Sequence, residues 1–132
     1  MNAAEKARTI ELATKIASTV TLFKQSFPDA KADLRPWLND PDTNQLVDPD
    51  SIDLSFNFPG VNRQIPSRAI LVQIRFSDSK MIGIEVSGYG HQGKQWSFST
   101  VADWEFHGTQ MPPLSFAHKL KQFARDLFKL FE

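Results

Sequence analysis

The chain has 132 residues, the usual length of one domain, and 41% of them are hydrophobic, which is enough to form a core without disulfides. Its 15 basic and 15 acidic side chains cancel, which excludes an overall field that would draw the protein to nucleic acid and favours self-association. The absence of cysteine excludes disulfides, thiolate metal sites and cysteine nucleophiles.

An amphipathic helix is predicted over residues 4–26, and Pro28 follows its end. Its apolar residues recur at three- and four-residue spacing, in a stripe that can pack on a sheet: Ile10, Ala13, Ile16, Ala17, Val20, Phe23 and Phe27. Lys15 and several threonines interrupt the apolar run, so the segment is not expected to be a signal peptide. No segment reaches the roughly 18 uninterrupted apolar residues of a membrane span. We therefore expect a soluble, cytoplasmic protein.

A connection rich in aspartate and proline is predicted over residues 28–51. Its prolines exclude a continuous helix or a central strand, and its Asp-Pro pairs favour turns. From Asp29 to Asp53, seven aspartates stand against two basic residues, which gives a local net charge of −5. Long loops in compact domains often carry function, and Trp37 is expected to pin this one to the body of the protein. Trp37, Asp40 and Asp42 are therefore candidate partner-binding residues.

Segments of alternating residues then predict four strands, over residues 52–58, 68–76, 81–87 and 95–100, and a short fifth one over 103–107. Short turns between them favour an antiparallel meander. One face carries the apolar residues: Leu54, Phe56, Phe58, Val72, Ile74, Phe76, Ile82, Ile84, Val86, Trp96 and Phe98. The other face carries polar residues, with Leu71 as the apolar exception: Ser55, Asn57, Gln73, Arg75, Glu85, Ser87, Ser97 and Ser99. One face of the sheet is therefore expected to be buried.

A second amphipathic helix is predicted over residues 114–131. Its phenylalanines and leucines share one side, and Lys121, Arg125 and Lys129 line another side at four-residue intervals. This pattern is also typical of a helix lying on a membrane surface, but the apolar face of the sheet needs a cover. The sequence therefore predicts one α+β domain over residues 1–132, with two layers and both helices on the same face of the sheet.

Two short motifs do not indicate a cofactor or a metal. Gly88, Gly90 and Gly93 spell GxGxxG, but the residues that follow predict a strand, whereas a dinucleotide site needs a helix there. Asp40, Asp42 and Asn44 have the spacing that opens a calcium loop, but the glycine and the glutamate that should follow are absent. We expect a glycine-rich turn in the first case, solvated aspartates in the second, and neither cofactor nor metal ligand.

No catalytic residue is assigned, because no nucleophile, base and orienting group can be assembled from spacing. His107 shares the predicted fifth strand with Asp103 and Glu105, which leaves a small hydrolase as the weaker alternative. A nucleic-acid-binding module is the other alternative, and it requires the sheet aromatics to be exposed for stacking on bases.

The preferred hypothesis is a small non-catalytic domain that acts in protein interaction or regulation. The expected partner is another protein or a second copy of the chain, rather than nucleic acid or a membrane. Tyr89 and His91 in the glycine-rich turn join Trp37 and the aspartates as candidates, because exposed aromatic residues on loops often serve recognition. Lys121, Arg125 and Lys129 complete the set. Residues 113–132 have a net charge of +2, from four basic and two acidic side chains, so this helix could meet the Asp-rich connection within one chain or across a homodimer.

Overall fold

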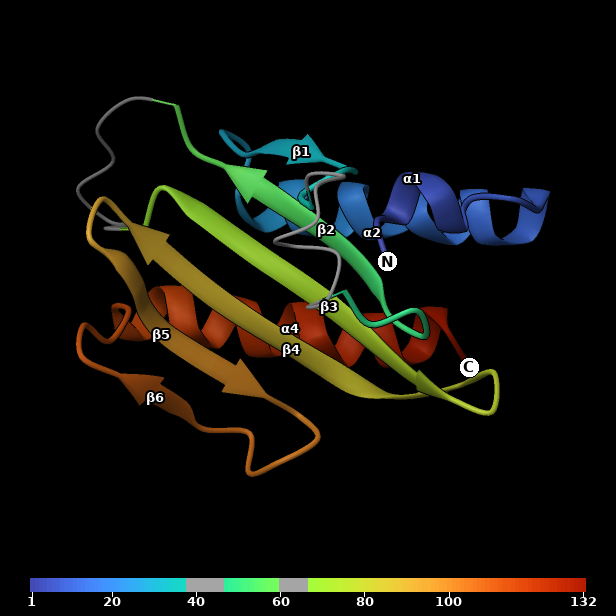
Figure 1. Ribbon diagram of the computed structural model, residues 1–132. Coiled ribbons are helices and arrows are strands. Elements are labelled where there is room, and N and C mark those ends of the chain that lie inside the picture. Colours follow the sequence, from blue (N-terminus) through green and yellow to red (C-terminus); the bar gives the residue numbers. More distant parts are fainter. Residues whose placement is uncertain (38–46, 60–66) are drawn as a thin grey trace.

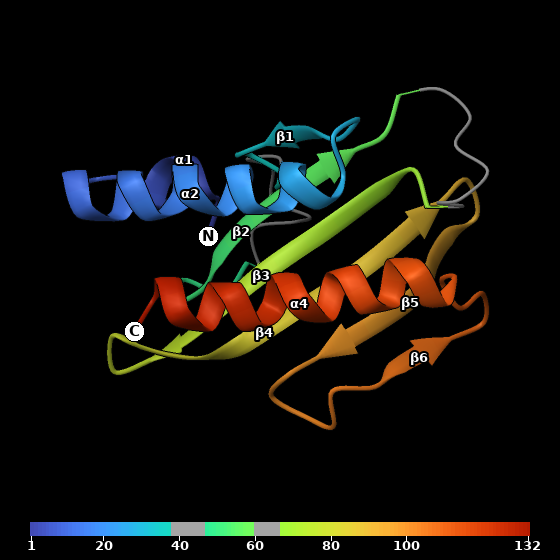
Figure 2. The ribbon, with the colours of Figure 1, turned by 180° about the vertical axis from the view of Figure 1, so that it is seen from behind.

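The sheet and the two long helices form two layers. The structure is a computed structural model that describes residues 1–37, 47–59 and 67–132. Six antiparallel strands form a single sheet in the order β1-β2-β3-β4-β5-β6, so that neighbours in the chain are neighbours in the sheet. Helices α2 and α4 both lie on one face of it, behind the sheet in Figure 1 and in front of it in Figure 2. The predicted α+β architecture is confirmed.

The elements differ from the predicted ones mainly in number. The helices are α1 (Ala3–Lys6), α2 (Ile10–Ser26) and α4 (Leu114–Leu130), and the strands are β1 (Lys31–Asp33), β2 (Ile52–Asn57), β3 (Ala69–Ser77), β4 (Lys80–Gly90), β5 (Gly93–Ser99) and β6 (Phe106–Gly108). The sheet has six strands instead of four or five. The additional strand, β1, lies inside the predicted connection and pairs with β2.

The predicted first helix is two helices, because the chain leaves the helical conformation at residues 7–9. Thr9 caps the second one, since its hydroxyl oxygen accepts a hydrogen bond from the backbone N–H of Leu12 at 3.1 Å. Ile10 therefore stands at the very start of α2 and is 89% exposed. Its predicted place in the buried stripe is wrong, and so are those of Ala13 and Ala17, which are exposed.

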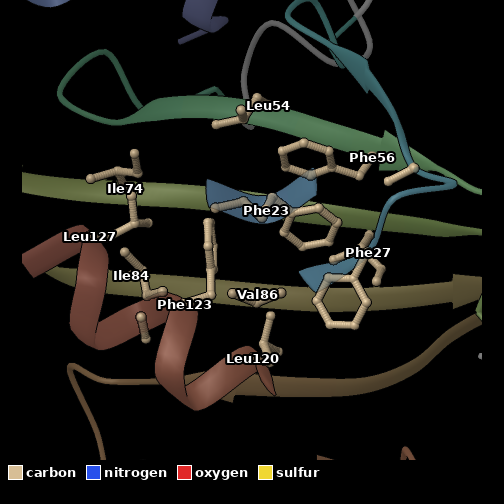
Figure 3. Packing of buried hydrophobic residues seen from close by; sticks show 14 of the residues in the cluster. Phe23, Phe27, Leu54, Phe56, Ile74, Ile84, Val86, Leu120, Phe123 and Leu127 are labelled. Atoms are coloured by element: carbon tan, nitrogen blue, oxygen red, sulfur yellow. The ribbon is translucent and has the colours of Figure 1, made fainter. Parts of the chain in front are cut away.

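The core is built around Phe23 of α2 (Figure 3). Its ring stacks on Phe56 of β2 with centroids 3.8 Å apart, and it meets the edge of Phe123 of α4 at 5.2 Å. Leu54, Ile74 and other fully buried aliphatic residues of the strands surround this aromatic contact. Phe23 thus joins both helices to the sheet, and its burial alone stabilises the fold by about 3 kcal/mol.

Ile82 departs from the predicted strand pattern. The register of β3 and β4 shifts after Arg75, which pairs with Gly83, so that Phe76 pairs with Met81. The shift inserts Ile82 as an extra residue, a β-bulge, and leaves its side chain 49% exposed. Ile82 was predicted on the buried face; its place against the core is taken by Met81.

Candidate functional site

Trp37 is held in a fixed position on the outer face of the sheet, the face away from α2 and α4. Its backbone N–H donates to Oδ1 of Asn2 at 2.9 Å, and its carbonyl accepts from Nδ2 of the same side chain at 3.0 Å. Its indole Nε1 donates to Oδ2 of Asp53 at 2.6 Å. Three hydrogen bonds therefore fix both the backbone and the ring plane of Trp37.

Asp53 is the centre of this anchoring. Its side chain is fully buried, and besides the indole it accepts hydrogen bonds from the Met1 amine at 3.0 Å and from Oγ of Ser51 at 2.8 Å. A buried carboxylate is stable only when it is paired and hydrogen-bonded in this way. The Met1 amine also donates to the carbonyl oxygen of Asp48 at 2.6 Å, which ties the end of the Asp-rich connection to the same cluster.

Arg75 of β3 extends the anchoring along the outer face. Its guanidinium contacts Oδ2 of Asp48 and Oε2 of Glu85, both at 2.8 Å. A hydrogen bond from the backbone N–H of Asp50, together with Arg75, holds the pKa of Asp48 below its ordinary value. Burial would lower the pKa of Arg75, but the hydrogen bonds and charges of Glu85 and Asp48 raise it above its ordinary value. The pair stays charged at neutral pH and fixes the segment before β2.

Trp37 and Tyr89 line a single groove of about 430 Å³, which we call the Trp37–Tyr89 groove. The groove crosses four strands, because its lining comes from β1 to β4: Asp33, Pro36, Trp37, Ser55, Asn57, Ala69, Leu71 and Tyr89. The register explains this, since Asp33 pairs with Ser55, Ser55 with Leu71, and Ala69 with Tyr89. The one apolar exception on the predicted polar face, Leu71, thus lines the same groove as the two aromatic residues.

A second hollow, of about 410 Å³, lies beyond Tyr89 at the turn between β4 and β5. We call it the cationic hollow, because Arg68 and Lys94 line it and none of the described residues in its lining carries a carboxylate. The other lining residues are Gly90, His91, Gln92, Gly93, Gln95, Thr109 and Gln110. Tyr89 lines only the groove, but it is next to the hollow in the sheet. It pairs with Lys94 across the strands, and its carbonyl accepts from the backbone N–H of Arg68 at 2.8 Å.

Two glycines of the GxGxxG motif lie at the turn of this hairpin, and the third leaves room for Trp96. Gly90 pairs with Gly93 where β4 turns into β5, so the predicted turn is confirmed. Gly88 lies against the indole of Trp96, and a Cβ added there would fall on the ring. The indole donates to Oγ of Ser67 at 3.0 Å. Trp96 and the other sheet aromatics pack on the helix side of the sheet, with Phe56, Phe58 and Phe98 buried and Phe76 partly buried.

The structure separates the other predicted candidates. His91 lies in the cationic hollow beside Tyr89, whereas Lys121, Arg125 and Lys129 lie on α4, in the other layer. Among the described residues no ion pair joins this helix to the Asp-rich connection, whose Asp48 and Asp53 pair with Arg75 and the Met1 amine. Asp40, Asp42 and Asn44 lie outside the described residues.

His107 pairs with Asp103, instead of sharing one face of a strand with Asp103 and Glu105 as predicted. Nε2 of His107 lies 2.8 Å from Oδ2 of Asp103, but Asp103 belongs to the turn before β6, and Glu105 contributes only its backbone N–H to that carboxylate. The hydrogen bond from His107 lowers the pKa of Asp103 below its ordinary value. The two side chains are 66% and 50% exposed, so water screens the pair. In the part of the chain that the structure describes, no group of three or more histidine and acidic residues could hold a metal ion.

A family model matches residues 4–132, nearly the whole chain. The chain belongs to this family. The family is described as a domain of unknown function. No curated protein and no solved structure matches the chain. In this domain of unknown function, none of the helices within the described ranges has the length and apolar character needed to cross a membrane.

Sequence reasoning missed the residues that assemble the site in this domain. Asn2, Asp53 and Lys94 carried no motif, and their partners lie far away in the chain or on the neighbouring strand. No signal in the sequence singled out Asp53, because it alternates with apolar residues in the same way as Ser55 and Asn57 do.

Proposed function

We propose that the chain is a non-catalytic protein-interaction domain, and that the Trp37–Tyr89 groove binds an extended peptide segment of a partner protein. One observation carries the proposal: two aromatic residues from distant parts of the chain line one groove together with the apolar side chain of Leu71. Buried clusters of aromatic residues dominate the binding energy at protein interfaces.

The chemistry of the groove suits a peptide. Trp37, Pro36 and Leu71 offer apolar contacts, whereas Asn57, Ser55 and the Tyr89 hydroxyl offer hydrogen bonds to peptide groups. Aromatic-lined grooves are a recurrent solution for extended segments, including proline-rich ones. Trp37 is fixed by its hydrogen bonds before any partner arrives, so binding loses little side-chain entropy at this residue.

The proposal places the protein in the cytoplasm, in line with its lack of cysteine. The proposal includes neither the nucleic-acid-binding module nor the small hydrolase. The sheet aromatics needed for base stacking lie in the core, and the exposed His107–Asp103 pair is not shielded from water as general acid–base chemistry requires.

The test is selection of a phage-displayed library of random linear peptides on the immobilised protein, followed by titration of the selected peptides. We expect selected peptides to lose at least about tenfold in affinity for Tyr89→Ala and for Leu71→Asp, since both changes remove contact area in the groove. Lys129→Ala, on α4, is the matched control and keeps wild-type affinity. Thermal unfolding verifies that each variant is folded.

Failure to select any peptide, or equal binding to Leu71→Asp and wild type, would refute the proposal. The oligomeric state of the free protein is measured alongside by light scattering. A dimer that Leu71→Asp dissociates would assign the groove to a second copy of the chain instead of a partner peptide.

A further inference from the structure

The cationic hollow is an unusual surface for a protein with no net charge. The whole chain balances 15 basic against 15 acidic side chains, yet Arg68 and Lys94 line one hollow together with His91, and the described residues of its lining include no carboxylate. All three side chains are exposed, and within the described part of the chain none of them forms an ion pair. The positive charge of Arg68 and Lys94 is therefore available to a ligand.

The hollow is adjacent to the groove through specific pairings. Lys94 lies opposite Tyr89 in the sheet, and a register shift between Gly88 and Tyr89 brings these two residues together. Because paired residues share a face, Lys94 projects on the same side as Tyr89. A ligand lying across the groove and over Tyr89 would therefore reach Lys94, which also lines the hollow.

Asp33 lies at the opposite end, on β1, and is the only charged residue among the described residues that line the groove. Its Oδ1 accepts from the backbone N–H of Arg35 at 2.9 Å. From β1 to β5 the sheet has four inter-strand steps, or about 19 Å at about 4.8 Å per step, and Lys94 is offset from Asp33 by two residues along the strands, which makes the separation about 20 Å. An extended peptide rises about 3.3 Å per residue, so about six residues span this distance.

We infer that the peptide bound in the groove carries a carboxylate that binds in the cationic hollow, and that a basic residue about six positions away binds Asp33. This inference rests on the proposed function. The Trp37–Tyr89 groove supplies apolar affinity, and the two charged ends fix the direction in which the peptide lies. Besides the basic side chains, the hydroxyl of Thr109 lines the hollow as a donor, and the space beside Gly93 is open to a ligand.

The test uses a positional-scanning library of labelled peptides with a fixed apolar centre. Wild type is expected to select Asp or Glu at one end and Lys or Arg at the other. Arg68→Glu combined with Lys94→Glu is expected to reverse the preference at the acidic end while the apolar centre is still selected. Lys121→Glu combined with Lys129→Glu changes the charge equally on α4, and is expected to keep the wild-type preference.

The outcomes separate this inference from the proposed function. Peptides that bind with no preference for a carboxylate, or a preference that survives the Arg68→Glu and Lys94→Glu changes, overturn the inference and leave the peptide groove in place. Binding that survives Leu71→Asp overturns the proposed function. An oligo-dT hexamer is the competitor: tighter binding than the selected acidic peptides, lost in Arg68→Glu with Lys94→Glu, overturns the inference in favour of nucleic acid.

Discussion

The two faces of the sheet are built from alternate residues of the same strands, yet they are organised by different physics. The helix-side face is apolar and buried, and the rings of Phe23, Phe56 and Phe123 pack against one another there. The outer face is held by hydrogen bonds and charges around Asp53 and Arg75, which draw in Met1, Asn2 and Trp37. The helix-side face stabilises the fold, whereas the outer face holds side chains such as that of Trp37 in fixed positions.

The largest effect is expected on the helix-side face. Phe23→Ala would remove the ring that joins α2, β2 and α4, and should lower the free energy of unfolding by about 3–5 kcal/mol. Urea titration followed by circular dichroism measures this loss. Phe23→Leu keeps most of the volume and should cost clearly less. Equal losses in the two variants would show that packing around Phe23 is loose.

Asp53→Ala tests the outer face at its most buried charge. The change leaves the Met1 amine and the indole N–H of Trp37 without their shared acceptor, and should lower the free energy of unfolding by about 2–4 kcal/mol. Asp50→Ala, at an exposed position nearby, is the control. Tryptophan fluorescence should also change in Asp53→Ala. An unchanged spectrum and stability would mean that the outer face does not depend on this carboxylate.

Gly88→Ala tests the close contact between β4 and Trp96 on the helix-side face. A methyl group there would fall on the indole of Trp96, and should destabilise the protein by about 1–3 kcal/mol through overpacking. Gly90→Ala is the matched control, because its Cβ would meet the flexible end of the Gln95 side chain. Chemical denaturation of both variants gives the comparison. If Gly90→Ala cost as much as Gly88→Ala, the close approach of Trp96 would not be the cause.

The smallest effect concerns pH. Since the folded protein holds the pKa of Asp48 below its ordinary value, the unfolded state binds the proton more readily. The backbone hydrogen bond from Asp50 and the ion pair with Arg75 therefore add stability above about pH 4, and this contribution is lost as the pH falls through the lower folded value. We expect Asp48→Asn to flatten the acid limb of a plot of unfolding free energy against pH. Asp29→Asn is the control, and an acid limb identical to that of wild type in Asp48→Asn would contradict this reading.

The helix-side face could be predicted from the sequence because period two and helical spacing are local patterns. Residues such as Leu54, Phe56 and Val72 therefore lie where alternation puts them. Ile82 was misplaced because a bulge adds a single residue without any turn signal. The break in the first helix was not predicted because no proline or glycine between Lys6 and Ile10 marks it, and only the Thr9 cap does.

Only part of the outer face could be predicted from the sequence. Trp37 and Tyr89 were identified separately as exposed aromatic residues, and the groove that joins them depends on the pairing register of four strands. The anchors of Trp37 come from Asn2 and Asp53, and no periodicity in the sequence links such distant positions. Strand β1 was not predicted, because its three residues are too few to show an alternation of apolar side chains.

The order of the strands in the sheet has a kinetic consequence. Each strand pairs with the next one in the chain, so most of the sheet can grow one hairpin at a time with short loop closures. The contact of Phe23 with Phe123 instead joins helices near the two ends of the chain and requires the largest closure. Docking of α2 against α4 is therefore expected to come late in folding, after the hairpins have formed a surface to receive both helices.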